Sequence, residues 1–235
     1  MSQTFNDKLK VLQKTYMKMG INVSDQIYQS IKAFTENDQK LATEIVNRDN
    51  KVNDEEVDLE KEALNLIALR QPVASNFRSI ITLLKASSDL ERIGDHASSI
   101  ARETLRINTE SRIPEVNEAI DQMALKIRGM LESSLDAYVH ADQEAAKLVA
   151  QEDILIDKKF VLAKNLIVSE MEKNSDKIEL ATIYLMVVRY LERIGDHIVN
   201  LSEWIVYNST GKIVELNPGK IEPELIAKEL KNNPK

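Results

Sequence analysis

The chain has 235 residues and a formal net charge of −7, from 31 basic and 38 acidic side chains. Glycine and proline number only 6 and 5, which is too little turn chemistry for a sandwich, a barrel or a doubly wound sheet and predicts long helices. The acidic balance argues against nucleic-acid binding, because that affinity depends on Lys and Arg neutralising phosphates. The chain contains no cysteine, which excludes disulfides, thiolate metal sites and a cysteine nucleophile.

The start of the chain is polar and lacks the apolar core of a signal peptide. The longest purely apolar run, near Ile183 to Val188, is far shorter than a membrane span. We therefore expect a soluble, cytoplasmic protein with no direct membrane insertion.

Three long helices are expected in the first half of the chain. Apolar side chains recur every three or four residues from Phe5 to Phe34, which predicts one long amphipathic helix. A break at residues 36–38 precedes a second helix from about Gln39 to Arg70. Pro72 then suits the first turn of a third helix that continues to about Asn108.

The same pattern then repeats. The block Leu-Glu-Arg-Ile-Gly-Asp-His at residues 90–96 recurs without a mismatch at residues 191–197. The sequence therefore predicts an all-α fold made by tandem duplication of a three-helix bundle, with six long helices. The first repeat is assigned to residues 1–110, the second to 111–211, and a C-terminal tail, expected as a short helix or a loose segment, to 212–235.

Acidic residues occupy repeated positions on the second and third helix of each repeat. On a helix, residues four apart lie about 40° from each other, so the paired acids share a face. The acids on the second helix of each repeat interrupt the apolar stripe of that helix. An ionised carboxylate without a partner is very costly to bury, so these side chains are protonated, paired with a cation or bound to a metal. The pairs are Asp49 with Asn53, Glu91 with Asp95, Asp153 with Asp157, and Glu192 with Asp196.

Two interpretations of the acids remain open. In the first, an arginine reaches across and pairs with them, and this buried ion-pair network only fixes helix register; the candidates are Arg78, Arg92, Arg189 and Arg193. In the second, they bind a metal. The metal interpretation also accounts for Gly94 and Gly195, which cost about 1 kcal/mol each inside a helix and leave room for a neighbouring helix or an ion. Oxygen ligands favour iron, manganese or magnesium, and zinc is an alternative.

The remaining residues with distinctive chemistry have simpler interpretations. His96 and His197 point about 100° away from the acid before them, which is more typical of a hydrogen-bonded or surface residue than of a ligand. Trp204 and Tyr207 are most simply core or interface packing.

The two LERIGDH blocks, the stretch from Asp49 onward and the segment Gln71-Pro72-Val73-Ala74-Ser75 resemble the PhoU family of phosphate-transport and phosphate-signalling regulators. The resemblance covers about residues 5 to 210. It implies two three-helix bundles side by side, with metal clusters, often of iron or zinc, on the bundle surface.

The resemblance also implies which side chains and partners take part. The ligands would be Asp49, Glu91 and Asp95 in one repeat, and Asp153, Asp157, Glu192 and Asp196 in the other. The family is not enzymatic; it restrains phosphate uptake and the phosphate-starvation response. Its partners are the ATPase of the phosphate ABC transporter and, in many bacteria, a sensor histidine kinase, and dimers are common.

The chain departs from the family pattern mainly in the first repeat. Asn53 stands where the second repeat has Asp157, and Glu56 stands opposite Phe160. The first site is therefore less acidic on its second helix unless Glu56 compensates. We predict that the second site binds metal at least as well as the first.

Two other functions compete with a metal-binding adaptor. A di-iron carboxylate enzyme of the ferritin-like kind needs Glu-x-x-His on two helices, whereas the position three residues after Glu91 is Gly94, and after Glu192 it is Gly195. A structural helical scaffold with ion-paired acids is the second alternative; recovery of bound metal would argue against it.

Overall fold

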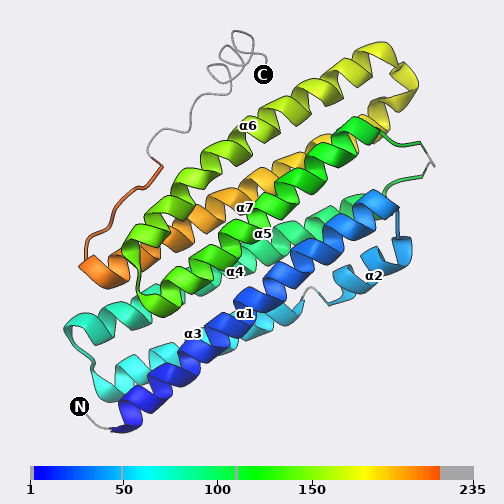
Figure 1. Cartoon of the computed structure of the whole chain (residues 1–235). Helices are drawn as coiled ribbons and strands as arrows, with labels where there is room; N and C mark the ends of the chain where they lie inside the picture. Colours follow the sequence, from blue (N-terminus) through cyan, green and yellow to red (C-terminus); the bar gives the residue numbers. More distant parts are fainter. Residues whose placement is uncertain (1–2, 49, 109–110, 218–235) are drawn as a thin grey trace.

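The structure is a computed structural model in which residues 3–48, 50–108 and 111–217 are described. The first repeat comprises helices α1 (Gln3–Glu36), α2 (Gln39–Asn47), α3 (Asn50–Arg70) and α4 (Ala74–Leu105). The second comprises α5 (Pro114–His140), α6 (Gln143–Lys173), a 3₁₀ turn η1 (Ser175–Lys177) and α7 (Ile178–Thr210). Every regular element in these ranges is helical, and the long helices lie side by side in an elongated bundle (Figure 1). The predicted all-α, duplicated bundle is confirmed.

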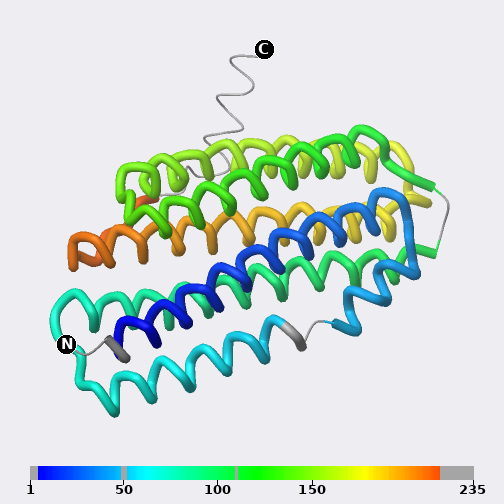
Figure 2. Tube along the Cα trace, turned by 60° about the horizontal axis from the view of Figure 1, so that its bottom comes forward, coloured from blue at the N-terminus to red at the C-terminus, as the bar shows by residue number. Residues whose placement is uncertain are grey.

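The second helix of the first repeat differs from its expected form. The sequence predicted one helix from Gln39 to Arg70, whereas the structure has α2 and α3 on either side of residues 48–49, and the two follow different directions (Figure 2). Arg48 ends α2, its N–H donating to the carbonyl of Ile45 at 3.1 Å. Ala42 and Ile45 of α2 pack with Ala33 and Ala101 in a small apolar cluster apart from the main core. This packing draws α2 toward the end of α4, while the matching α6 is continuous.

The turn between α3 and α4 corrects the expected start of the third helix. Gln71 has a left-handed backbone (φ 45°), and its N–H donates to the carbonyl of Ile67 at 2.9 Å. Pro72 follows this left-handed residue, where proline commonly terminates a helix. Pro72 therefore ends α3, and α4 begins two residues later at Ala74.

The two repeats share one hydrophobic core. Helices α4 and α7 pack against each other along the contact between the repeats, and α1 packs against α5. Aromatic pairs join the repeats: Phe34 meets the ring of Tyr184 edge-on at 4.9 Å, and Tyr16 meets Tyr138 at 4.8 Å. Burying such rings contributes about 0.5–1.5 kcal/mol per pair beyond the apolar area removed from water. The repeats are consequently held as a single packed unit.

The end of α7 leads into an ordered segment. Residues 211–217 have no regular secondary structure, and Val214 and Leu216 pack against the main core. The first residues of the predicted tail therefore lie against the bundle. The rest of the predicted tail, residues 218–235, lies outside the described residues.

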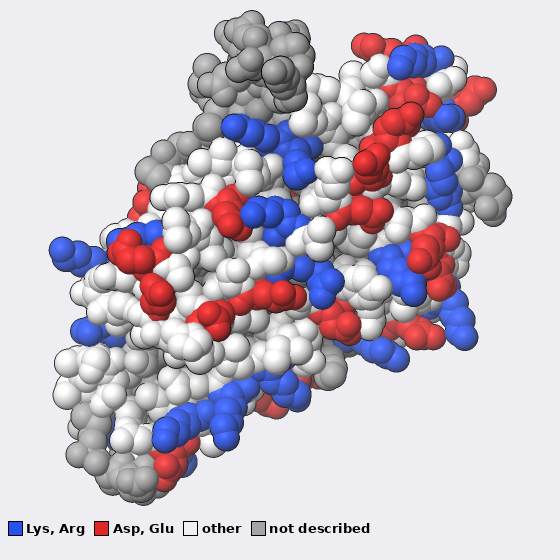
Figure 3. Space-filling view, in the orientation of Figure 1, with Lys and Arg blue, Asp and Glu red and all other residues white. Residues whose placement is uncertain are grey.

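The outer surface mixes charges of both signs. Over the face seen in Figure 3, Lys and Arg alternate with Asp and Glu without a broad field of one sign. Of the helices described, none is long and apolar enough to cross a membrane.

Candidate functional site

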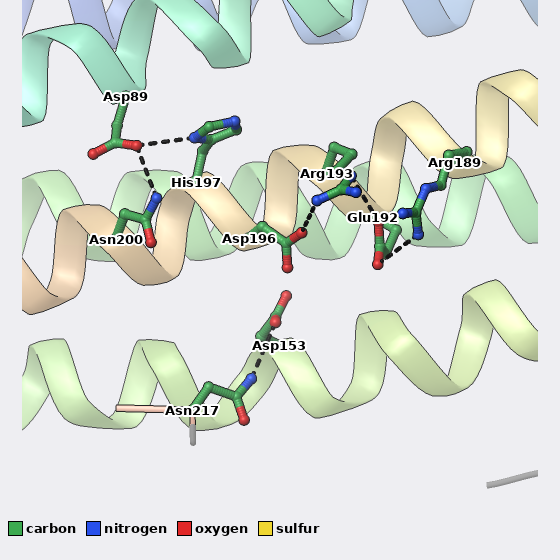
Figure 4. A network of polar contacts seen from close by, with 9 residues as sticks. All are labelled: Asp89, Asp153, Arg189, Glu192, Arg193, Asp196, His197, Asn200 and Asn217. Atoms are coloured by element: carbon green, nitrogen blue, oxygen red, sulfur yellow. Dashed lines mark hydrogen bonds and ion pairs between the residues drawn. The ribbon is translucent and has the colours of Figure 1, made fainter. Parts of the chain in front are cut away.

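Four acidic residues lie on the neighbouring helices α6 and α7, and we call them the second acidic site: Asp153, Asp157, Glu192 and Asp196. Three of them are buried in the bundle, with Asp153 only 1%, Glu192 6% and Asp157 8% exposed. Asp153 and Asp157 lie one turn apart on α6, on the face whose buried apolar residues pack toward α7. Figure 4 shows the carboxylates of Asp153 and Asp196 pointing toward one another between the two helices.

Gly195 provides the space that Asp153 occupies. A Cβ built on Gly195 would overlap the Oδ1 atom of Asp153, so a side chain on α7 at this position would displace the carboxylate. Gly94, at the matching position of α4, is less constrained by the described residues: its Cβ would lie 3.5 Å from Gln26 Oε1 and from Val52 Cγ1. The repeated glycine therefore has a direct steric reason in the second repeat.

Arginines on α7 neutralise part of the second acidic site. Arg189 pairs with Glu192 at 3.0 Å, and Arg193 lies 3.4 Å from Asp196 and 3.9 Å from Glu192 (Figure 4). In these pairs the arginine lies on the same helix as its acid. Ion pairing is thus supported at Glu192 and Asp196, but the expectation that the arginine reaches across to these acids is wrong for these pairs, because both partners lie on α7.

The first acidic site consists of Glu56 on α3 with Glu91 and Asp95 on α4. Burial raises the pKa of Glu91, and the nearby carboxylates of Asp95 and Glu56 raise it further, against the lowering effect of Arg92. Burial, with Glu60, also raises the pKa of Glu56. The carboxylates of Asp95 and Glu56 thus both act electrostatically on Glu91, and Arg92 is the cation that opposes them. Arg92 lies 3.7 Å from Glu91 and 3.6 Å from Asp95.

Asn53 and Asp49 are the other two residues predicted for the first site. Asn53 on α3 is exposed, and Asp49 lies outside the described residues. Glu56 is therefore the described α3 carboxylate that faces Glu91.

A paired exchange distinguishes the two sites. In the first repeat, a side-chain hydrogen bond from Ser88 favours the ionised form of Glu56. At the matching positions of the second repeat, the guanidinium of Arg189 lies 5.8 Å from the ring centre of Phe160. A serine–carboxylate pair is thus replaced by an arginine–aromatic pair, a favourable cation–π arrangement. Each repeat therefore has a favourable pair at these positions. The residue three positions before the third-helix glutamate is uncharged in the first repeat and positively charged in the second.

The donor chemistry of both sites fits a hard divalent cation. The ligands offered are carboxylate oxygens, which suit magnesium, manganese and iron, and also zinc. The space over Gly195 holds the buried carboxylate of Asp153 where α6 meets α7. With the side chains placed as they are, no three Asp, Glu or His residues of the described ranges converge closely enough to hold one ion, so binding would need rotamer changes.

Asp89 is a polar residue between the repeats that sequence analysis did not identify. Its Oδ1 lies 2.9 Å from Nδ1 of His197 and accepts from Asn200 Nδ2 at 2.9 Å, while Oδ2 accepts from Trp204 Nε1 at 3.2 Å (Figure 4). Asp89 lies on α4 and its three partners on α7, so the network ties one repeat to the other. The duplicated pattern gave no signal for it, because the matching residue of the second repeat is Tyr190.

The two motif histidines meet beside this network. Their rings lie 5.6 Å apart, and His96 also stacks on Tyr190 at 5.8 Å. Burial lowers the pKa of His96 to about 4, with the positive charges of His197, Arg193 and Arg92 acting in the same direction. His96 is accordingly neutral at pH 7, and His197 is the hydrogen-bonded residue that its position predicted.

Comparison with known proteins shows which family has this architecture. The model of the PhoU domain matches residues 16–104 and 120–205, one copy in each repeat. The chain belongs to the PhoU family. It is 36% identical over 214 residues to the phosphate-specific transport system accessory protein PhoU homolog of Clostridium acetobutylicum, covering 91% of this chain and 97% of that protein.

Solved structures of PhoU proteins share the fold. The crystal structure of the phosphate transport system regulatory protein PhoU from Streptococcus pneumoniae superposes with a TM-score of 0.84 at 30% identity, covering 89% of this chain and 99% of that one. PhoU from Pseudomonas aeruginosa gives the same TM-score at 31% identity, covering 88% and 100%. The Clostridium acetobutylicum relative is named as an accessory protein and the Streptococcus pneumoniae one as a regulatory protein, and none of the three is named as an enzyme.

Proposed function

We propose that this protein is a metal-binding regulator of phosphate uptake and of phosphate-starvation signalling. In this role it restrains the phosphate ABC transporter through the ATPase subunit, and it restrains a sensor histidine kinase. The observation that carries the proposal is the similarity, over about nine-tenths of both chains, to a protein named as an accessory of phosphate-specific transport. The names of the relatives, an accessory protein and a regulatory protein, support an adaptor rather than an enzyme.

The decisive test is a pull-down of the tagged protein from phosphate-replete cells, combined with elemental analysis of the recovered material. We expect the transporter ATPase, the sensor kinase and a divalent metal, iron or zinc first, to be recovered with it. Recovery of the folded protein with neither partner would contradict the regulatory proposal. Sedimentation of the same material tests the proposed homodimer.

Metal binding is proposed for the carboxylates of both repeats. In the first repeat, Asp49, Glu56, Glu91 and Asp95 would hold the ion, with Asn53 beside them; in the second, Asp153, Asp157, Glu192 and Asp196 would do so. A bound ion would neutralise the crowded carboxylates and link the second helix of each repeat to the third. Support comes from the space over Gly195 and from the raised pKa of Glu91.

The two sites can be compared by paired variants. We propose that the second binds metal at least as well as the first, because Asp157 adds a carboxylate where the first repeat has Asn53. The variant Asp153→Asn/Glu192→Gln should then lose at least as much metal as Asp49→Asn/Glu91→Gln. A larger loss from the first-repeat variant, or no metal in the wild-type protein, would contradict this.

A scaffold with ion-paired acids is the second candidate. It is favoured by the 3.0 Å pair between Arg189 and Glu192. Elemental analysis separates the two: an intact folded protein without metal, still bound to the transporter, would favour the scaffold.

A further inference from the structure

A short segment after α7 returns to the bundle, and we call residues 211–217 the C-terminal strap. Gly211 ends α7 with a left-handed backbone (φ 73°), and its N–H donates to the carbonyl of Tyr207 at 2.8 Å. Glycine adopts this conformation without the penalty that a side chain would bring. The chain is thereby turned back from the helix axis.

Two contacts fix the strap against α7 and the core. Val214 and Leu216 pack against the main hydrophobic core. The N–H of Leu216 donates to Oε1 of Glu203 at 2.9 Å. Burial raises the pKa of Glu203, and this N–H opposes the shift by stabilising the ionised form. A partly buried carboxylate thus serves as the acceptor that holds the strap's backbone.

The strap ends on the second acidic site. The side-chain amide of Asn217 donates to Oδ2 of Asp153 at 3.2 Å (Figure 4). The other oxygen, Oδ1, lies against Gly195 on α7. The two oxygens of this buried carboxylate are therefore held in different directions, one toward the strap and one toward the helix that carries Glu192 and Asp196.

The chain that follows the third helix of the first repeat has a different course. The segment that follows α4 leads into α5 within eight residues, so it is the connection between the repeats rather than a strap. The strap is consequently an asymmetric addition to a duplicated fold.

We propose that Asn217 is a positioning residue for a divalent cation at the second acidic site. By holding Oδ2 of Asp153, it keeps Oδ1 directed toward α7, so that this one carboxylate is pre-oriented, while the other acidic side chains of the site change rotamer to reach the ion. Hydrogen bonds of this kind to metal-binding side chains orient them, and their loss typically weakens metal affinity by about 10- to 100-fold. The inference rests on the proposed metal binding and adds to it a part of the chain outside the two repeats.

The test measures Mn²⁺ affinity by calorimetric titration of the full chain, with the first acidic site disabled by Glu91→Gln and Asp95→Asn. In this background we expect Asn217→Ala to weaken Mn²⁺ binding by about 10- to 100-fold. Asn217→Gln keeps an amide donor and should recover part of that loss. Lys212→Ala, an exposed change in the same strap, should bind as the background protein does.

A second readout separates positioning from a purely structural role. In the background protein, Mn²⁺ should slow hydrogen exchange in the strap, and in Asn217→Ala it should not. Unchanged affinity in Asn217→Ala would overturn the inference while leaving metal binding intact. No Mn²⁺ binding in either the wild-type or the background protein would instead overturn the proposed metal function, and the inference with it.

Discussion

Asp89 of the first repeat and His197 of the second lie 2.9 Å apart, from Oδ1 to Nδ1, at the centre of the α4–α7 contact. In the internal duplication, Asp89 matches Tyr190 and His197 matches His96. The rings of Tyr190 and His96 stack. One half of this pseudo-symmetric contact is thus polar and the other aromatic. The asymmetry indicates that the interface joins these two repeats specifically and would not form equally well between two copies of either one.

The first prediction concerns this contact. Asp89→Ala removes the acceptor for His197, Asn200 and Trp204 and leaves these three partly buried donors without it, so we expect it to lower the free energy of unfolding by about 1–3 kcal/mol. Urea denaturation followed by circular dichroism measures the change. The matched control is Asp136→Ala, because Asp136 pairs with His140 at 3.3 Å on an exposed surface; its loss should cost less than about 0.5 kcal/mol. Equal effects would show that the network does not hold the repeats together.

The two motif glycines provide the second prediction. Gly195→Ala would force a methyl group against Asp153 Oδ1, and we expect about 1–3 kcal/mol of destabilisation from overpacking. Gly94→Ala meets its described neighbours at an ordinary 3.5 Å and should be neutral or stabilising by up to about 1 kcal/mol, because alanine favours helix. Thermal melts in chelator compare the two variants. A destabilisation of similar size in both would mean that the glycines serve a purpose unrelated to Asp153.

The third prediction is a pH dependence at Glu91. Because its pKa is raised in the folded protein, the folded state binds its proton more tightly than the unfolded chain, whose glutamates titrate near about 4.3. The free energy of unfolding therefore falls as the pH rises from the pKa of the unfolded chain through the higher pKa of Glu91 in the folded protein. Above the folded-state pKa the full loss of stability remains. Glu91→Gln removes the penalty, so in chelator the variant should melt higher than wild type at pH 7, with the gain vanishing below about pH 4.

Glu192→Gln is the control for this titration. It loses the 3.0 Å pair with Arg189, so at pH 7 it should melt lower than wild type. A gain in both variants would indicate that both glutamates are strained by neighbouring acids and that Arg189 does not compensate Glu192.

The sequence was sufficient for features that follow from local periodicity and duplication. Apolar spacing located the long helices, and the repeated motif located Glu91, Asp95, Glu192 and Asp196 on matched faces. The split between α2 and α3 was not predictable in this way, because α2 is positioned by tertiary packing of Ala42 and Ile45 near Ala101.

The contacts of two residues outside the repeat pattern were not predicted, for a related reason. Asp89 has a tyrosine at its matching position, and Asn217 lies beyond both repeats, so neither leaves a recurring signal. Their roles depend on which helices and segments meet in space. Arg92, Arg189 and Arg193 were correctly named as candidate partners, whereas the side chain of Arg78 lies beside Gly211. The sequence could not show that Arg189 and Arg193 pair with acids of their own helix.

The last prediction follows from the exchange of Ser88 and Glu56 for Arg189 and Phe160. The guanidinium of Arg189 contacts Glu192, a proposed ligand, and so opposes an incoming cation both by repulsion and by occupying the carboxylate. Arg189→Gln removes the charge but retains part of the side chain beside the Phe160 ring. We expect it to raise Mn²⁺ affinity at the second site about fivefold, the effect of about 1 kcal/mol at a partly exposed position. Calorimetric titration with the first site disabled measures it.

The reciprocal variant places a charge where the first repeat lacks one. Ser88→Arg, measured with the second site disabled by Asp153→Asn and Glu192→Gln, should lower Mn²⁺ affinity at the first site by about the same factor. If Arg189→Gln weakened binding instead, Arg189 would be holding Glu192 in place for the ion rather than competing with it. The two sites would then differ in how their glutamates are oriented and not in their net charge.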